Sequence, residues 1–410
     1  MQPTNFIIYQ LDLNIANLPY IRTYLAAKKS GASILPLSQS EITERLLNED
    51  KERCDLNPYP PVMLTDPSLG HWDLHWPDGA KPAGDWYEEV ALDGNYKGRD
   101  PARDIRDATV CIDFGTAGTV VASRDNSGEV SLLRVGALGA KGRQNIEPSH
   151  YVNPTVLSIL HSEKLLDAWR DIPYRPSIRW LDAKSSHQAK NELTGRVRHS
   201  FYDIETWAKG KTADEPRILV DERDKELRIP IPPASSENDI AVDFATLPLN
   251  PIELYAYYIG LALNNQADNG GRIFTEYCMT FPAGFDRETR DRILDGFRRG
   301  LMRSLPPSLV YGSKWNAAKF KVIERASEPA ALAAALLPLL KDESESGADA
   351  KIIEPTKEGV AFGVFDFGGG TTDFAIGLYR LPTEEEEEGK GGEKVVDILD
   401  NAGDPSLGGE

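Results

Sequence analysis

A short pattern that occurs twice constrains the fold of this chain more than any other feature. Residues 112–119 and residues 365–372 both follow the pattern apolar–Asp–Phe–Gly–x–x–x–Thr, and apolar segments flank each copy. Apolar segments on both sides of a glycine-containing turn are typical of a β-hairpin. One such turn could be no more than a tight bend, but two matched copies indicate a duplicated unit with two lobes that face each other.

The residue types in both copies suit a bound phosphate. Glycine allows the backbone to approach a ligand closely and to adopt φ values that other residues avoid, and successive N–H groups around a turn form an anion nest. Asp113 and Asp366 each stand at the end of the first strand of a predicted hairpin. Carboxylates suit Mg²⁺, which keeps several waters and bridges phosphates. The alternative is two ordinary hairpins with aspartates at buried edges.

Composition excludes several classes of partner. The 410 residues carry a net charge of −18 at pH 7, which disfavours nucleic acid and anionic membranes as partners. The three cysteines are widely spaced and have no CxxC pairing, which predicts a reducing compartment without a disulfide framework. No apolar stretch is long enough to span a membrane, and no secretory leader is evident. We therefore expect a cytoplasmic protein.

The chain divides into three parts by composition and pattern. Residues 1–107 are rich in proline and tryptophan and form an N-terminal extension of unknown role. Residues 108–345 contain alternating strands and helices of an α/β first lobe, with an inserted subdomain at about 157–248. Residues 360–410 begin the second lobe with the second hairpin. Of the polar surface insertions, the glutamate run within 383–394 is expected to be a solvated hairpin tip.

Helix and strand signals are clear in the second half of the first lobe. Asn250 is placed as the N-cap of a helix over 249–265, with proline at the first helical position. A buried strand is expected within 275–285, followed by a helix capped by Asp286. An alanine-rich helix is expected over 328–340.

The N-terminal extension offers fewer signals. One helix is expected to open at Ser38, with Glu41 at the capping-box spacing, and to run to about Asn48. His71 and His75 flank an aspartate, but no third ligand accompanies them, so surface packing by the nearby tryptophans is favoured over a metal site.

Five segments, taken in their order along the chain, resemble the Hsp70 branch of the actin/Hsp70/sugar-kinase ATPase superfamily. They are the two phosphate turns IDFGTAGTVVA (112–122) and VFDFGGGTTDFAI (364–376), the strand–turn–helix TFPAGFDRETRDRIL (280–294), the interlobe segment ERASEPAALAAAL (324–336), and NAGDPSLGGE (401–410). The resemblance covers about 108–410 and not the extension. It implies an actin-like ATPase (ribonuclease H-like) fold whose second lobe continues beyond Glu410.

The resemblance also implies roles for individual residues, with ATP or ADP and Mg²⁺ as cofactors. Catalytic roles fall on Asp113, Lys184, Glu328 and Asp366. Asp113 and Asp366 would hold the hydration shell of Mg²⁺. The nucleotide-binding residues would be Gly115, Thr116, Ala117, Gly368, Gly369, Gly370, Thr371 and Asp373. Hydrolysis would be phosphoryl transfer to water through positioning and charge stabilisation.

Two of these positions remain open. The family uses a lysine near the γ-phosphate, and Lys184 lies in a matching Asp-Ala-Lys context, but Lys209 and Lys211 are alternatives. Ala117 stands where the family often has a second hydroxyl residue, which would weaken phosphate contacts or slow turnover.

Three functions compete. The first is an Hsp70-like ATPase module, chaperone-like, that switches lobe geometry and so controls a protein client or cofactor protein. The second is an actin- or MreB-like filament protein. The third is a scaffold that acts through residues 1–107 without using nucleotide. A sugar kinase is disfavoured, since no segment offers a sugar-binding base. Fold-level analogy alone does not separate these roles.

Overall fold

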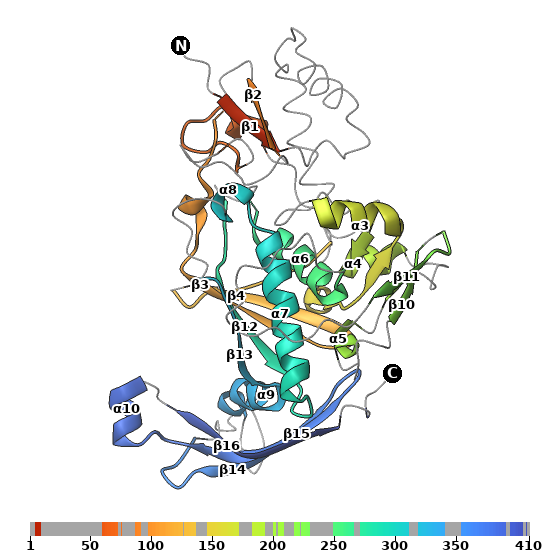
Figure 1. Ribbon diagram of the computed structural model, residues 1–410. Coiled ribbons are helices and arrows are strands. Elements are labelled where there is room, and N and C mark those ends of the chain that lie inside the picture. Colours follow the sequence, from red (N-terminus) through yellow and green to blue (C-terminus); the bar gives the residue numbers. More distant parts are fainter. Residues whose placement is uncertain are drawn as a thin grey trace.

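The protein is described by a computed structural model. The part of the chain that the structure describes comprises residues 5–9, 60–72, 75, 87–91, 97–125, 127–136, 146–171, 183–192, 200–201, 204–208, 217–221, 223–229, 249–265, 271–310, 319–340, 354–390, 394–404 and 407. Within it, strands and helices mix in an α/β arrangement (Figure 1).

A six-stranded mixed sheet forms the centre of the molecule, with strand order β13-β12-β3-β4-β5. The sixth strand, β6, pairs with the first residues of β4. Its strands are β3 (Ala108–Phe114), β4 (Gly118–Asp125), β5 (Val130–Leu132), β6 (Val152–Pro154), β12 (Glu276–Phe281) and β13 (Lys321–Ser327). β4 is antiparallel to β3, β5 and β6, whereas β12 is parallel to both β3 and β13. The predicted first hairpin is therefore present.

One face of this sheet carries the main core. Along β3, Val110, Ile112 and Phe114 are buried while the residues between them are more exposed, which is the alternation of a half-buried strand. Helices α6 (Pro251–Leu263) and α7 (Arg287–Arg303) pack on this face. The centroid of the Phe114 ring lies 5.8 Å from that of Tyr255 in α6 and 4.9 Å from that of Phe297 in α7. These ring pairs tie the end of β3 to both helices.

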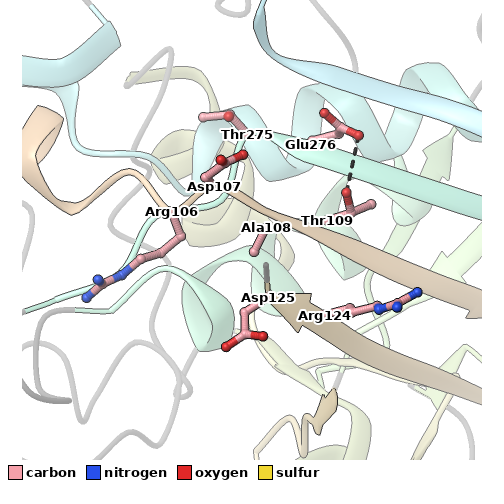
Figure 2. Close-up of a pocket in the computed structure, with 8 residues that line it drawn as sticks. All are labelled: Arg106, Asp107, Ala108, Thr109, Arg124, Asp125, Thr275 and Glu276. Atoms are coloured by element: carbon pink, nitrogen blue, oxygen red, sulfur yellow. Dashed lines mark hydrogen bonds between the residues drawn. The ribbon is translucent and has the colours of Figure 1, made fainter. Parts of the chain in front are cut away.

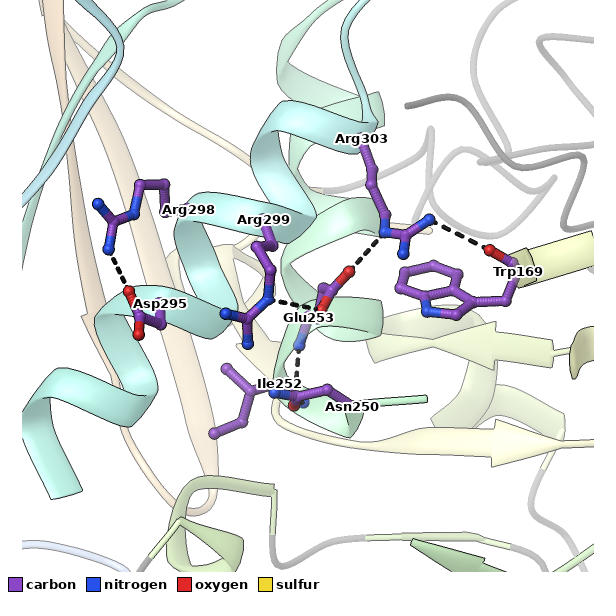
Figure 3. Close-up of polar contacts among 8 residues, drawn as sticks. All are labelled: Trp169, Asn250, Ile252, Glu253, Asp295, Arg298, Arg299 and Arg303. Carbon is purple, nitrogen blue, oxygen red and sulfur yellow. Dashed lines mark hydrogen bonds and ion pairs between the residues drawn. The ribbon is translucent and has the colours of Figure 1, made fainter. Parts of the chain in front are cut away.

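The contact between α6 and α7 contains a buried charge network (Figure 3). Glu253 is 1% exposed and accepts hydrogen bonds from Arg303 Nε at 2.5 Å and from Arg299 Nε at 3.0 Å. Arg303 is fully buried, donates to the Trp169 carbonyl at 3.2 Å, and lies over the Trp169 ring at 4.0 Å. The buried carboxylate is thus paired by two arginines of α7, and Arg303 also joins Trp169 to this contact.

Smaller elements lie between β6 and α6. They are α3 (Ser162–Asp171), α4 (Ser186–Glu192), α5 (Ile204–Trp207), the sheet β8-β7-β9 (Ala183–Ser185, Leu157–Ile159, Ser200–Phe201) and the ribbon of β10 (Arg217–Val220) and β11 (Glu226–Ile229). Trp169 and Trp207 are both at most 1% exposed and join the main core. These elements fall within residues 157–248, where an inserted subdomain stays a prediction.

A second sheet, with order β14-β15-β16, follows at the opposite end of the molecule from β1 and β2 (Figure 1). Its strands are β14 (Val360–Phe367), β15 (Thr372–Arg380) and β16 (Val395–Asp404), all antiparallel. One face packs Tyr379 against Ala333 and Leu337 of the helical segment 328–339. The other face exposes Phe365 and Phe367, which are 67% and 63% accessible.

The helix and cap predictions for 249–303 are confirmed. The Asn250 side chain accepts hydrogen bonds from the backbone at the start of α6, and Asp286 accepts one from the Thr289 N–H at the start of α7. The predicted helix over 328–340 is shorter: α9 spans Glu328–Leu336, and a 3₁₀ turn at Leu337–Leu339 follows because Pro338 cannot continue the α-helical hydrogen bonds. The glutamate run forms helix α10 (Glu384–Lys390) between β15 and β16, where Glu386 pairs with Arg380.

The N-terminal part contributes to the core, contrary to the expected surface packing. Trp72 is 3% exposed, and its indole N–H donates to Asp104 Oδ2 at 2.7 Å. Arg99 donates to the same carboxylate, and the backbone of Asp104 accepts from the Ile273 N–H. The physical reason is that this buried carboxylate needs partners, and Trp72 and Arg99 supply them. The remaining elements here are β1 (Asn5–Tyr9), β2 (Tyr87–Ala91) and 3₁₀ turns at Pro61–Leu64 and Pro101–Asp104.

Other short elements complete the described chain. A 3₁₀ turn spans Pro148–Tyr151 and helix α8 spans Pro307–Val310. His75 lies 3.7 Å from Asp100, and no metal-binding group includes it or His71 among the described residues. The helix expected at Ser38 to Asn48 lies outside the described residues. Within the described chain, no helix combines the length and the apolar character needed to cross a bilayer.

Candidate functional site: two facing hairpin turns

The two Asp-Phe-Gly turns have the same backbone hydrogen bond. In the first turn the Gly115 N–H donates to the Gly118 carbonyl at 3.2 Å, and in the second the Gly368 N–H donates to the Thr371 carbonyl at 2.9 Å. Each turn joins two antiparallel strands that continue into a third antiparallel strand, β5 in one sheet and β16 in the other. The repeat inferred from the sequence is thus a repeat of three-stranded meanders.

The turns touch each other across the two sheets. A Cβ atom placed on Gly370 would lie 2.3 Å from Thr116 Oγ1, and one on Gly369 would lie 2.8 Å from the Ala117 Cβ. Side chains never approach so closely, so only glycine permits this contact. The expectation that these glycines adopt unusual φ values is wrong, because none of Gly115, Gly368, Gly369 and Gly370 has a φ in the left-handed region. Close packing of the two turns is the reason for glycine at positions 369 and 370.

Asp113 and Asp366 lie at corresponding strand ends beside the turns. Asp113 accepts a hydrogen bond from Thr280 Oγ1 on the adjacent strand β12 at 3.1 Å. Desolvation is the main effect that raises the pKa of Asp113; the Thr280 hydrogen bond opposes it, and the charge of Asp366 adds to it. Desolvation, followed by the charge of Asp373, raises the pKa of Asp366. Two strand-end carboxylates from separate lobes are therefore close enough to interact electrostatically.

Glu328 belongs to the same group of carboxylates. It is the first residue of α9, and its Oε1 is buried and makes no hydrogen bond with any described residue. Burial raises the pKa of Glu328 to about 9, reinforced by the charges of Asp113, Glu205, Asp373 and Asp366. The interlobe helix therefore directs a neutral carboxyl toward both hairpins at pH 7.

Asp373 links the two lobes directly. It is 1% exposed, and its Oδ1 accepts the Ala283 N–H at 2.6 Å from the turn between β12 and α7. A Cβ on Gly403 of β16 would lie 2.2 Å from Asp373 Oδ1 and 2.4 Å from the Gly284 nitrogen. Asp373 thus makes a buried contact between the second hairpin and the turn after β12, and its support of a phosphate loop stays a prediction.

Sequence analysis did not identify the residues that hold the first turn in place. The Thr116 hydroxyl donates to Glu205 of α5, and Thr155 Oγ1 donates to the Gly115 carbonyl at 2.7 Å. Thr155 also lies 2.8 Å from Thr119, the threonine of the repeated pattern. Glu205 comes from the inserted region, where the sequence has no motif that could have identified it.

The other predicted site residues are placed as follows. Thr371 is 6% exposed in the second turn. Lys184 lies on strand β8, in register with Ser158, and the contact of its side chain with a phosphate stays a prediction. Lys209 and Lys211 lie outside the described residues. The predicted turn residues and carboxylates therefore converge from both lobes, together with Glu205.

A separate polar pocket lies at the other end of the first hairpin (Figure 2). Its volume is about 210 Å³, and charged side chains of both signs line it, among them Arg106, Arg124, Asp125 and Glu276. Thr109 in this pocket donates to Glu276 at 3.2 Å. Thr109 and Glu276 stand at the starts of β3 and β12, whereas Asp113 and Thr280 stand at the ends of these strands. This pocket is therefore distinct from the facing turns.

The carboxylates fit a hard divalent cation, because oxygen ligands are those that Mg²⁺ prefers. Among the described residues, no cluster of three or more His, Cys, Asp or Glu lies close enough to bind a metal ion directly. A cation held here through its waters is consistent with that spacing, since Mg²⁺ retains several waters in proteins. Phosphates would fit between the turns only after the Gly370–Thr116 contact opens.

The fold and the site define an α/β protein in which two repeated hairpins bring several carboxylates together. Comparison with known proteins adds nothing more specific, because the sequence matches no protein-family model and no curated protein.

Proposed function

We propose that this chain is an Hsp70-like nucleotide-binding module with an actin-like fold that binds Mg-ATP between its two hairpin turns. The observation that carries the proposal is the meeting of two identical Asp-Phe-Gly turns, from separate sheets, with a strand-end aspartate beside each. Backbone N–H groups at such turns favour phosphate oxygens, and the aspartates favour the accompanying cation.

In this proposal, Asp113 and Asp366 hold the waters of Mg²⁺, and Mg²⁺ when bound neutralises phosphate charge. Thr116 and Thr371 offer hydroxyl groups on the two turns, one to each side of the phosphates. Glu328, whose pKa is raised to about 9, lies with these aspartates, and its carboxyl group would hydrogen-bond to a water and orient it for attack. Slow hydrolysis would alter the relation of the two turns and so control a client or cofactor protein.

A nucleotide-independent scaffold is the second candidate, and one observation favours it. The two turns pack against each other through Gly369 and Gly370, so the two sheets make a direct contact at this site. In a scaffold this contact would be permanent. In a nucleotide-binding module it has to break, which lowers the apparent affinity.

Calorimetric titration of Mg-ATP into the 410-residue chain separates the two candidates. Binding that is lost in the Asp113→Asn, Asp366→Asn double variant supports the proposal, because Asn keeps the size of the side chain and removes its charge. Glu163→Gln is the control and leaves binding unchanged. It alters an exposed carboxylate that pairs with Lys225, which lies between β10 and β11. No heat of binding with wild type, at concentrations that would detect a Kd of 100 μM, favours the scaffold.

A further inference from the structure

Two of the three cysteines face each other across neighbouring strands. Cys111 of β3 and Cys278 of β12 are direct partners in the parallel register, and their sulfur atoms lie 2.9 Å apart. Both are free thiols. Neighbouring strands lie about 4.8 Å apart, which falls within the Cα separation of about 4.4–6.8 Å that a disulfide bridges. The backbone already has the spacing that a bond between them requires.

The two thiols differ in access. Cys111 is exposed, whereas Cys278 is only 9% accessible. The hydrogen bond with Cys278 lowers the pKa of Cys111 to about 7, against the effect of desolvation, and the positive charges of Arg325 on β13 and Arg124 on β4 also favour the thiolate form. Cys111 is therefore the thiol that a solvent oxidant meets first, and Cys278 lies within reach of whatever forms there.

This cysteine pair is the middle one of three contacts between β3 and β12. Thr109 donates to Glu276 on one side, and Thr280 donates to Asp113 on the other. Residues two apart on a strand share a face, so the three contacts form one ladder along the open face of the sheet. A covalent bond at the centre would fix the strand pair that carries Asp113.

We propose that Cys111 and Cys278 form a peroxide-responsive thiol pair that closes into an intrachain disulfide. The Cys111 thiolate attacks one oxygen of a hydroperoxide, the O–O bond breaks, and the alkoxide or hydroxide leaves with a proton; Cys111 becomes a sulfenic acid. The Cys278 thiol then attacks the Cys111 sulfur, the S–S bond forms, and the S–O bond breaks to release water. Two thiols and one hydroperoxide give one disulfide, one alcohol or water, and one water.

This proposal does not depend on nucleotide binding. In a reducing compartment, disulfides are mostly transient and redox-sensing, and the sequence contains only one further cysteine, Cys54. That cysteine provides an internal comparison, because a random oxidation would include it.

The test is to treat the full chain with hydrogen peroxide, quench with catalase, alkylate the remaining thiols and analyse the protein by mass spectrometry. The expected result is loss of two of the three alkylatable thiols, a mass lower by two hydrogens before alkylation, and a tryptic link between peptides 107–124 and 273–287. Dithiothreitol restores all three thiols. A link that includes Cys54, or three fully alkylated thiols after treatment, would overturn the proposal.

Matched variants identify the order of the two steps. Cys54→Ser keeps the link, and Cys278→Ala accumulates a sulfenic acid at Cys111 that dimedone traps. Dimedone adducts at Cys54 alone would contradict the assignment of Cys111 as the attacking thiol. The wild-type and Cys54→Ser measurements decide the proposal even if Cys278→Ala fails to fold.

Discussion

Replacing Glu328 by Gln is expected to stabilise the nucleotide-free protein near neutral pH. The Glu328 carboxyl is buried at the start of α9, its Oε1 makes no hydrogen bond with the described residues, and four other carboxylates act on it. Glutamine has the same shape and no charge, so it removes the cost of keeping this group out of water. The substitution changes no residue that packs the turns together.

The magnitude follows from the pKa of Glu328, which rises from an ordinary 4.5 to about 9. Because the folded protein then binds a proton that the unfolded chain has released, wild-type stability falls as pH rises between these two values. One proton corresponds to about 1.4 kcal/mol per pH unit. The free energy of unfolding of Glu328→Gln should therefore gain about 2.5 kcal/mol on wild type from pH 5 to pH 7.

Urea unfolding at pH 5, 6 and 7, in EDTA to exclude cations, measures this difference. Glu163→Gln is the control: the Lys225 hydrogen bond and charge lower the pKa of Glu163, so its pH dependence has the opposite sign and, on an exposed side chain, should be small. A difference between Glu328→Gln and wild type that is constant across this pH range would refute the reasoning, because it would show that Glu328 is solvated and ionised.

Two further substitutions test the contacts between elements. Gly370→Ala places a Cβ 2.3 Å from Thr116 Oγ1, so it should lower the free energy of unfolding, measured by urea titration, by about 1–3 kcal/mol. Gly363→Ala is the control, because its Cβ would lie an ordinary 3.8 Å from Phe374 and should leave the free energy of unfolding unchanged. Arg303→Met removes a positive charge that pairs with the buried Glu253 carboxylate, so it should lower the free energy of unfolding by about 3 kcal/mol. The 87% exposed Arg287 should tolerate the same change. Equal effects at the two arginines would contradict a buried network.

The sequence was sufficient to predict the elements whose signals are local. Two hairpins, the helix capped by Asn250 and the helix capped by Asp286 all depend on residues close together in the chain, and all are present. The shorter extent of α9 also has a local cause, Pro338, which the alanine-rich composition of the segment concealed. Turn and cap chemistry therefore transferred directly from sequence to structure.

Features that depend on long-range packing could not be predicted in this way. Glu205 reaches Thr116 from a short helix with no motif, and Trp72 becomes part of the core because Asp104 needs buried partners. The role of the glycines in the turns was also misjudged. Their backbone angles are ordinary, and only the approach of the other lobe, hundreds of residues away, excludes a side chain at Gly370.

Three carboxyl groups converge where the two turns meet. Desolvation and neighbouring charge disfavour ionisation of Asp113, Asp366 and Glu328 together, so this arrangement carries a cost in stability. Structural ion-pair networks place cations beside buried acids, as Arg303 does beside Glu253. At the turns, by contrast, the effects that raise the pKa values of the three acids are burial and other carboxylates. A cation that binds only the folded state would offset this cost by mass action, and that need is the strongest physical reason to look for Mg-nucleotide at this site.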